Sequence, residues 1–230
     1  MKNSLVKRCL RDTFPVMTGY LVLGIGFGIL MKTNGYGFLW AFLMSLFIYA
    51  GSMQYLAVGL LTGGASLVTF FVSTLMVNAR HLFYGISMID RYRNTGKKKP
   101  YLIFALTDET YSLVCKDIEG IEGEDIKKYY LLVSLFDQVY WVVGSAIGAL
   151  LGAVITFDTK GIDFALTALF ITVFTDQWLK TKNHLAAIIG VVMSVFCLVL
   201  FGSENFLIPT MGLILISLIL MKKYATKEEA

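Results

Sequence analysis

The stretch FLWAFLMSLFIYAGSMQYLAVGLL, Phe38–Leu61, is long and apolar enough to cross a membrane, but a glycine and several polar groups interrupt it. A helix of about 20 apolar residues spans the hydrocarbon core of a bilayer, which is about 30 Å thick. The interruption lies in YAGSMQY, Tyr49–Tyr55. Irregular backbone at membrane depth is tolerated only where protein or a watery cavity surrounds it. We therefore expect this block to enter the membrane and return, or to be broken, at Gly51 and Ser52.

The composition of the whole chain agrees with a membrane location. Of its 230 residues, 57% are hydrophobic and 16% are charged, whereas soluble domains carry about 25% charged residues. The apolar blocks are Phe14–Met31, Phe38–Leu61, Ala65–Ile89, Tyr129–Ile155, Ile162–Leu179, Leu185–Gly202 and Phe206–Met221. They predict an all-α polytopic membrane protein. The sequence has no phosphate loop, H-E-x-x-H or C-x-x-C motif, so we expect neither an enzyme nor a cofactor or metal site.

Two regions of the chain, residues 12–115 and 129–223, resemble each other. The matching positions, in the same order in both regions, are Gly24 with Gly148, Gly28 with Gly152, and Gln54 with Gln177. Repeated halves are a common plan of transporters, in which the substrate site lies between the halves. We therefore expect a single transporter domain made of two related halves. The glycines themselves are expected to form close helix-packing faces.

The distribution of basic residues predicts a topology. Lysines and arginines gather near the N-terminus and in Arg91–Lys99, and such loops tend to remain in the cytoplasm. An even number of crossings must then separate them, so the interrupted Phe38–Leu61 block is expected not to cross. Tyr101–Cys115 becomes a short crossing, with the acidic Lys116–Lys128 segment outside. Each half then has an odd number of crossings, which predicts inverted repeats with both termini in the cytoplasm. The alternative is a set of about seven or eight plain helices with one basic loop outside.

A polar cluster, Asn78, Arg80 and His81, lies in the apolar Ala65–Ile89 block. An arginine at the bilayer centre costs roughly 2.5–3.5 kcal/mol on insertion scales, so intramembrane ionisable residues are functional candidates. Asn78 and His81 are three positions apart and share a helix face. Alternatively, the block ends near Asn78 and Arg80 snorkels to the cytoplasmic interface.

A second group consists of Asp108 and Glu109 in LTDETYSL, within a short apolar run. Two adjacent carboxylates at membrane depth need partners, and Arg80 and His81 are suitable ones. Burial can also raise the pKa of a carboxyl, which suits reversible protonation. The alternative is an interfacial helix whose carboxylates face water.

The remaining candidates are Asp137, in SLFDQVYW, and the pair Asp176 and Gln177, in FTDQWL. Asp137 could pair with either basic residue of the first cluster. Asp176 and Gln177 fall at the repeat position of Gln54 and the residue before it. Interrupted segments at corresponding positions in two halves are the best sequence indication of a transporter site.

Several of these motifs resemble the AzlC-type branched-chain amino acid exporter family. They are FPVMTGYLVLGIGFGIL, YAGSMQYLAVGLL, VNARHLFYGISM, LTDETYSL and FTDQWL, and together they cover nearly the whole chain. The resemblance implies export of leucine, isoleucine, valine and methionine from the bacterial cytoplasm across the inner membrane. It also implies a small hydrophobic AzlD-type partner subunit. The residues that it marks as important are Gln54, Asn78, Arg80, His81, Asp108 and Glu109. One departure is Tyr49, where family members often carry a smaller residue.

Together these observations predict a proton-coupled secondary transporter. The expected substrate-binding residues are Gly51, Ser52, Gln54, Asn78, Arg80, Asp176 and Gln177. The expected proton-coupling residues are His81, Asp108, Glu109 and Asp137, with His81 and Asp108 as a relay because imidazole titrates near neutral pH. Two other functions remain open: a passive channel, and an intramembrane hydrolase with Ser52 as nucleophile and His81 as base.

Overall fold

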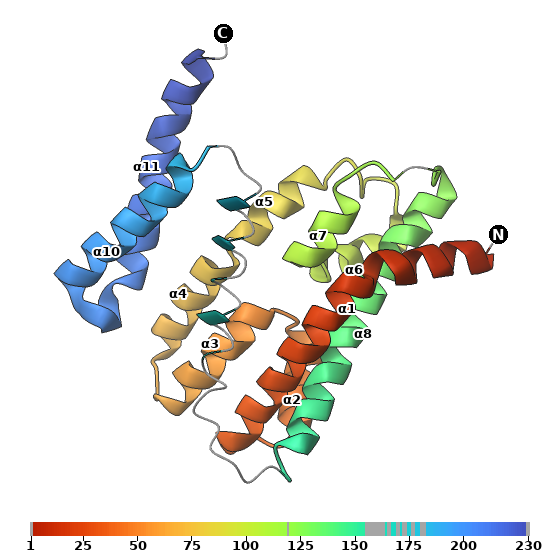
Figure 1. The fold of residues 1–230 in the computed structure, drawn as a ribbon, viewed down its shortest axis with the longest axis horizontal. Coiled ribbons are helices and arrows are strands. Elements are labelled where there is room, and N and C mark those ends of the chain that lie inside the picture. The colour runs from red at the N-terminus through yellow and green to blue at the C-terminus, as the bar shows by residue number, and fades with distance from the viewer. Residues whose placement is uncertain are drawn as a thin grey trace. The chain divides into compact units, whose positions relative to one another are not determined.

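The computed structural model describes residues 2–118, 120–154 and 183–228, together with positions 164, 167, 168, 171, 174, 175, 178 and 179. All regular structure in this part of the chain is helical (Figure 1). The chain divides into two units. The first contains Met1–Phe70 and Val77–Leu166, and the second contains Phe71–Met76 and Thr167–Ala230. The expectation of an all-α protein is therefore confirmed for the described residues.

Two long helices, α1 (Lys2–Thr33) and α8 (Glu124–Leu151), form the centre of the first unit. They approach so closely that a Cβ atom on Gly24 would lie 3.0 Å from the carbonyl oxygen of Trp141. A Cβ on Gly144 would lie 3.0 Å from the carbonyl oxygen of Leu21. A Cβ on Gly28 would lie even closer to the backbone of Ser145 and Ala149. The glycines therefore act as a packing seam, as expected from the sequence.

The seam also shows the relative direction of the two helices. Gly24 lies against Gly144, about two turns before the end of each helix, whereas Lys32, at the end of α1, lies against Gly152 just after α8. The two helices therefore run parallel. Inverted repeats would make these opening helices of the two expected halves antiparallel, so this expectation is wrong for α1 and α8. The boundaries of the two halves remain a prediction.

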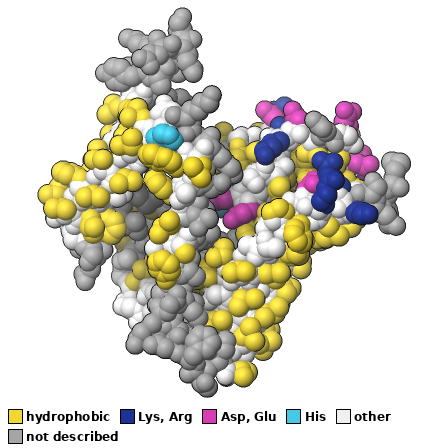
Figure 2. Space-filling view, viewed as in Figure 1, with side chains coloured by type: hydrophobic (Ala, Val, Ile, Leu, Met, Phe, Trp, Pro, Cys, Tyr) yellow, Lys and Arg dark blue, Asp and Glu magenta, His cyan; other side chains and the backbone are white. Residues whose placement is uncertain are grey.

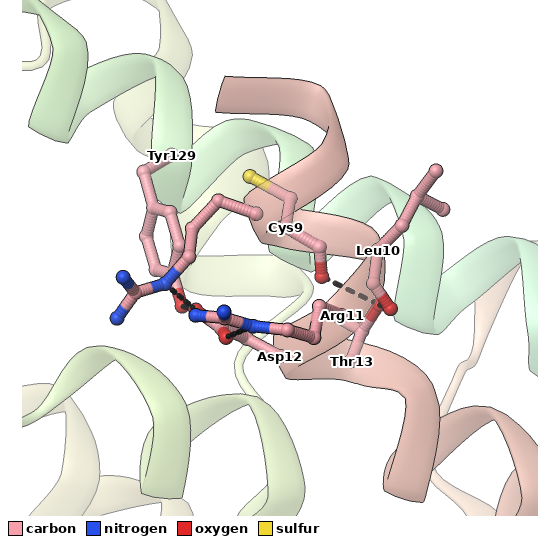
Figure 3. Close-up of polar contacts among 7 residues, drawn as sticks. Cys9, Leu10, Arg11, Asp12, Thr13 and Tyr129 are labelled. Atoms are coloured by element: carbon pink, nitrogen blue, oxygen red, sulfur yellow. Dashed lines mark hydrogen bonds and ion pairs between the residues drawn. The ribbon is translucent and has the colours of Figure 1, made fainter. Parts of the chain in front are cut away.

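The parallel helices define two sides of the first unit. We call the side where α1 and α8 begin the N-terminal side, and the side where they end the C-terminal side. On the N-terminal side, Asp12 accepts hydrogen bonds from Arg8 Nε at 2.8 Å and from the Tyr129 hydroxyl at 3.0 Å (Figure 3). This cluster joins the first turns of α8 to α1. A cavity of about 370 Å³ lies beside it, lined by Ser112 and Lys116 among others.

The interrupted block forms two helices, α2 (Phe38–Phe47) and α3 (Gly51–Thr62). The helical path is broken at Ile48–Ala50, immediately before Gly51. The α2 helix begins on the C-terminal side, and α3 runs back toward that side (Figure 1). The block is therefore broken as expected, although at Ile48–Ala50 and not at Gly51 and Ser52, which lie in the first turn of α3. That the pair is re-entrant in a membrane stays a prediction.

A second broken pair enters from the N-terminal side. It follows α4 (Leu67–Asn78), α5 (Arg80–Ser87) and a short 3-10 turn, Gly96–Lys98. The pair consists of α6 (Lys99–Phe104) and α7 (Asp108–Val114).

The ends of this second pair lie on one side. Arg91, before α6, donates to the carbonyl oxygen of Lys116, after α7, at 3.1 Å and pairs with Asp117 at 3.0 Å. The expectation that Tyr101–Cys115 crosses and leaves Lys116–Lys128 opposite Arg91 is therefore wrong. The physical reason is length: the segment has fewer than the about 20 residues that a crossing requires. It turns back where Thr107 caps the start of α7.

The second unit contains α10 (Leu185–Asn205) and α11 (Leu207–Glu228), which pack against each other. Gly202 interrupts α10 with a φ of 72°, a conformation that glycine adopts readily. Across the described residues, three helical segments are long and apolar enough to cross a membrane: Leu5–Thr33, Glu124–Leu151 and Leu185–Gly202.

The surface agrees with a membrane environment. Figure 2 shows hydrophobic side chains over much of the visible face, whereas the lysines and arginines gather on the N-terminal side of the first unit. Val22 of α1 and Leu82 of α5 are among the exposed hydrophobic side chains. Such a surface suits contact with lipid and not with water.

Candidate functional site

The breaks of the two re-entrant pairs meet inside the first unit. The ring of Tyr49, in the α2–α3 break, lies 6.3 Å from the ring of Phe104 at the end of α6, measured between centroids. Tyr49 is buried and has a φ of 47°. This left-handed conformation costs a non-glycine residue roughly 1–2 kcal/mol. Backbone strain of this kind persists only where surrounding contacts impose it, and it is common at functional sites.

Arg80 connects the two pairs. It is the first residue of α5, and its Nη1 atom pairs with Asp108 Oδ2 at 3.0 Å. Its Nη2 atom donates to Ser52 Oγ at 3.2 Å. The Arg80 and Asp108 side chains are 36% and 32% exposed, so neither is fully buried. The guanidinium therefore lies between the first turn of α3 and the first residue of α7.

A buried polar layer supports this arrangement. Gln54 is fully buried, and its Oε1 atom accepts from Trp141 Nε1 at 3.0 Å. Its Nε2 atom donates to Ser45 Oγ at 3.2 Å, and that hydroxyl donates to Ser145 Oγ at 2.8 Å. The Gln54 amide thus ties α3 to α2 and α8. Its position favours a supporting role behind Gly51 and Ser52, and not direct contact with a substrate.

A chain of hydroxyl groups connects two carboxyls of the site. Tyr20 Oη lies 2.6 Å from Glu109 Oε2 and 2.7 Å from Thr107 Oγ1. Thr107 Oγ1 is 3.1 Å from Thr110 Oγ1, which lies 2.7 Å from Asp137 Oδ2. We call these five residues the hydroxyl chain. It leads from the partly exposed Glu109 to Asp137, whose side chain is completely buried.

His81 follows Arg80 in α5 without joining its ion pair. His81 Nδ1 lies 3.2 Å from the carbonyl oxygen of Asn78, and its ring packs edge-on against Tyr84. Asp108 instead pairs with Arg80. The structure therefore does not form the expected His81–Asp108 relay. Among the described contacts, Ser52 Oγ is joined to Arg80 and His81 Nδ1 to the carbonyl oxygen of Asn78, so the pairing of Ser52 with His81 that a hydrolase would require is not formed.

The expected site residues fall into three groups. Arg80, Asp108, Gly51 and Ser52 come together around the two breaks, as predicted. Asp137 lies near them but is bonded to Thr110, and among the described residues it forms no salt bridge. Asp176 and Gln177 lie outside the described residues.

Sequence reasoning missed Tyr20 and Thr110, which connect the two carboxyls. Thr110 carried a signal, because Thr-x-x-Thr at the start of a short helix is typical of a capping turn; the Thr110 amide donates to Thr107 Oγ1. Tyr20 carried none, since it is an isolated tyrosine in an apolar helix. Its role depends on a contact with Glu109, which is remote in sequence.

The site therefore places groups of opposite charge and a chain of hydroxyls close together. The guanidinium of Arg80 and the N-terminus of α3, which carries a partial positive charge, are suited to a carboxylate. Asp108 and Glu109 are suited to an ammonium group. Such a site, near interrupted helices, is the plan of many secondary transporters.

Comparison with known proteins gives an independent result. The family model described as AzlC protein matches residues 15–155. The branched-chain amino acid transport protein AzlC of Bacillus subtilis (strain 168) is 44% identical over 218 residues, covering 94% of this chain and 85% of that protein. An uncharacterized membrane protein of Helicobacter pylori (strain ATCC 700392 / 26695) is 42% identical over 220 residues, covering 94% and 96%.

A more distant relative is the inner membrane protein YgaZ of Escherichia coli (strain K12). It is 24% identical over 193 residues, which cover 80% of this chain and 79% of that protein. No solved structure matches the chain. The similarity to the first relatives extends over nearly the full length of both partners.

Proposed function

Because this chain belongs to the AzlC family, we propose that it exports branched-chain amino acids across the bacterial inner membrane, driven by protons that move inward. Leucine, isoleucine and valine are the substrates, with methionine as a further one of similar size. The named Bacillus subtilis relative transports branched-chain amino acids, which supports the substrate class. The direction of transport and the proton coupling are our proposal.

The ion pair of Arg80 and Asp108 is the single observation that carries this function. Its atoms are 3.0 Å apart at the junction of two re-entrant pairs. A substrate carboxylate would compete with Asp108 for the guanidinium and would also face the first amides of α3. Asp108, once displaced, would accept the substrate ammonium. Breaking one ion pair and forming two in this way selects an α-amino acid over a simple acid or amine.

The apolar tail requires a nonpolar surface near the ion pair. Phe104, which is 42% exposed and whose ring neighbours that of the buried Tyr49, supplies aromatic surface at the meeting point of the breaks. Covering a branched aliphatic side chain with such a surface stabilises binding by about 25 cal/mol per Å² of apolar area that is buried. Asn78 and His81 would position Arg80 from the end of α4 and the first turn of α5. Glu109 and Asp137 would carry protons.

The experiment is leucine counterflow in proteoliposomes that contain this chain and its small AzlD-type partner subunit. We expect saturable exchange of leucine, isoleucine, valine and methionine. Net leucine transport, unlike exchange, should also move protons across the membrane, which a pH-sensitive dye inside the liposomes detects. If none of the four amino acids exchanges, the proposed substrate class is wrong. Non-saturating flux that ignores the proton gradient would identify a passive channel instead.

A further inference from the structure

The hydroxyl chain consists of Glu109, Tyr20, Thr107, Thr110 and Asp137, and its donors and acceptors can be counted. Four contacts of 2.6–3.1 Å join these five residues in series. Each contact needs one hydrogen atom between its two oxygens. The three hydroxyl groups supply three hydrogens. The fourth must therefore come from a carboxyl group at one end of the chain.

Two arrangements satisfy the count. In one, Glu109 is protonated and donates to Tyr20, all hydroxyls point toward Asp137, and Asp137 is ionised. In the other, Asp137 is protonated and donates to Thr110, all hydroxyls point toward Glu109, and Glu109 is ionised. If both carboxyls are ionised, one contact has no hydrogen. If both are protonated, one contact has two. The geometry therefore fits one proton shared by two carboxyls.

From this count, and resting on the proposed proton coupling, we propose that Tyr20, Thr107 and Thr110 form the proton path between Glu109 and Asp137. A proton that reaches Glu109 passes to Tyr20 Oη as the Tyr20 proton moves to Thr107. The Thr107 proton moves to Thr110, and the Thr110 proton moves to Asp137. Each O–H bond that breaks is replaced by one that forms. The net change is transfer of one proton and one negative charge between the two ends.

The surroundings of the chain suit this role. Asp137 is completely buried, so another route for its proton would have to pass through packed protein. Tyr49, from the α2–α3 break, faces Tyr20 and both carboxyls. Tyr101 of α6 also lies near Asp137, but its hydroxyl donates to Gln138 Oε1 at 2.7 Å. Asp108, which pairs with Arg80, precedes Glu109 in the sequence, so substrate binding at this pair would change the charge beside Glu109.

The test separates proton movement from substrate movement. Exchange of labelled for unlabelled leucine needs no net proton transfer, whereas uphill leucine transport does. In Tyr20→Phe and Thr110→Val we expect exchange to stay within about twofold of the parent. We expect leucine-coupled proton flux to fall at least about tenfold, since positioned proton-transfer groups contribute on the order of 10²–10⁴-fold. Thr110→Ser keeps the hydroxyl and should retain both activities.

Two matched controls exclude a general effect of deleting a buried hydroxyl. Tyr55→Phe removes a hydroxyl that donates to the carbonyl oxygen of Leu23 at 2.6 Å, outside the chain. Thr13→Val removes a fully buried hydroxyl that donates to the carbonyl oxygen of Cys9 at 2.9 Å. Both controls should keep coupled proton flux.

Three results would overturn the proposal. The first is parental proton flux in Tyr20→Phe or Thr110→Val. The second is equal loss of exchange and proton flux in these variants, which would indicate a structural or substrate-binding role. The third is a loss in Thr110→Ser as large as that in Thr110→Val. A parent protein that exchanges no amino acid would instead contradict the proposed function itself.

Discussion

Arg80 has a geometry that another basic residue could not reproduce. Its two terminal nitrogens reach different partners, Asp108 at 3.0 Å and Ser52 at 3.2 Å. A guanidinium offers donors in a planar fork, whereas the ammonium of lysine is a single charged point. The position of Arg80 therefore depends on its shape as well as on its charge.

We expect Arg80→Lys to raise the KM for leucine at least about tenfold, because one lost charge-assisted hydrogen bond costs about 1.5–3 kcal/mol. Leucine exchange measured over a range of concentrations checks this. Arg93→Lys is the control, since the Arg93–Asp90 pair is exposed and 3.6 Å long. If Arg80→Lys transports leucine like the parent protein, the planar shape of the guanidinium has no role in leucine binding.

Gln54 is expected to contribute to stability more than to specificity. Replacing it with leucine preserves volume but leaves the indole N–H of Trp141 without its acceptor, whereas Ser45 keeps its hydrogen bond to Ser145. Each unsatisfied buried group costs about 1–3 kcal/mol. The purified variant should therefore unfold at a lower temperature. Thr62→Ala, at the exposed end of α3, should leave the unfolding temperature unchanged.

Sequence reasoning at the residue scale succeeded where charge was the signal. Arg80 needed an acidic partner at membrane depth, and Asp108 is that partner. It failed for His81, because adjacency in the sequence does not show which way a ring points. It also missed Tyr20, whose neutral hydroxyl has no counterpart in its own helix and acquires its role through Glu109.

At the scale of elements, the two re-entrant pairs share a plan but enter from opposite sides. The break in α2–α3 was predictable, because Gly51 and Ser52 interrupt an otherwise continuous apolar block. The return of α6–α7 was not predictable from the sequence, because it is shown by contacts of Arg91 with Lys116 and Asp117, which are remote from it in the chain. Counting apolar blocks cannot reveal such a contact.

Labelling of single cysteines tests the return of α6–α7. In a background without native cysteines, we expect Lys98→Cys and Asp117→Cys to react with an impermeant thiol reagent from the same side of the membrane. Asn34→Cys, in the turn after α1, should react from the opposite side. Labelling of Asp117→Cys together with Asn34→Cys would mean that α6–α7 crosses.

For the molecule as a whole, the glycine seam between α1 and α8 is the main constraint. A side chain on Gly28 would collide with the backbone of Ser145 and Ala149, which cannot yield as the end of a flexible side chain could. The seam thus fixes the separation of the helices that carry Tyr20 and Asp137. The hydroxyl chain depends on that separation.

We expect Gly28→Ala to destabilise the protein by about 1–3 kcal/mol, the usual cost of overpacking. Gly19→Ala is a control on the same helix, since no described atom lies within 4 Å of the Cβ that it would add. Thermal unfolding in detergent compares the two variants. Equal stability of Gly28→Ala and the parent protein would show that α1 and α8 are farther apart than described.

The parallel seam also has a consequence for how the protein is made. Gly24 leaves the ribosome long before Gly144, and both re-entrant pairs are synthesised between them. Neither pair can span the bilayer, and the broken backbone of each is tolerated only when protein surrounds it. Insertion must therefore hold α1 and the unfinished pairs near the translocon until α8 emerges. A nascent chain that ends before Glu124 lacks α8, so the glycines of α1 have no helix to pack against. We expect quality-control proteases to recognise such a chain as incomplete.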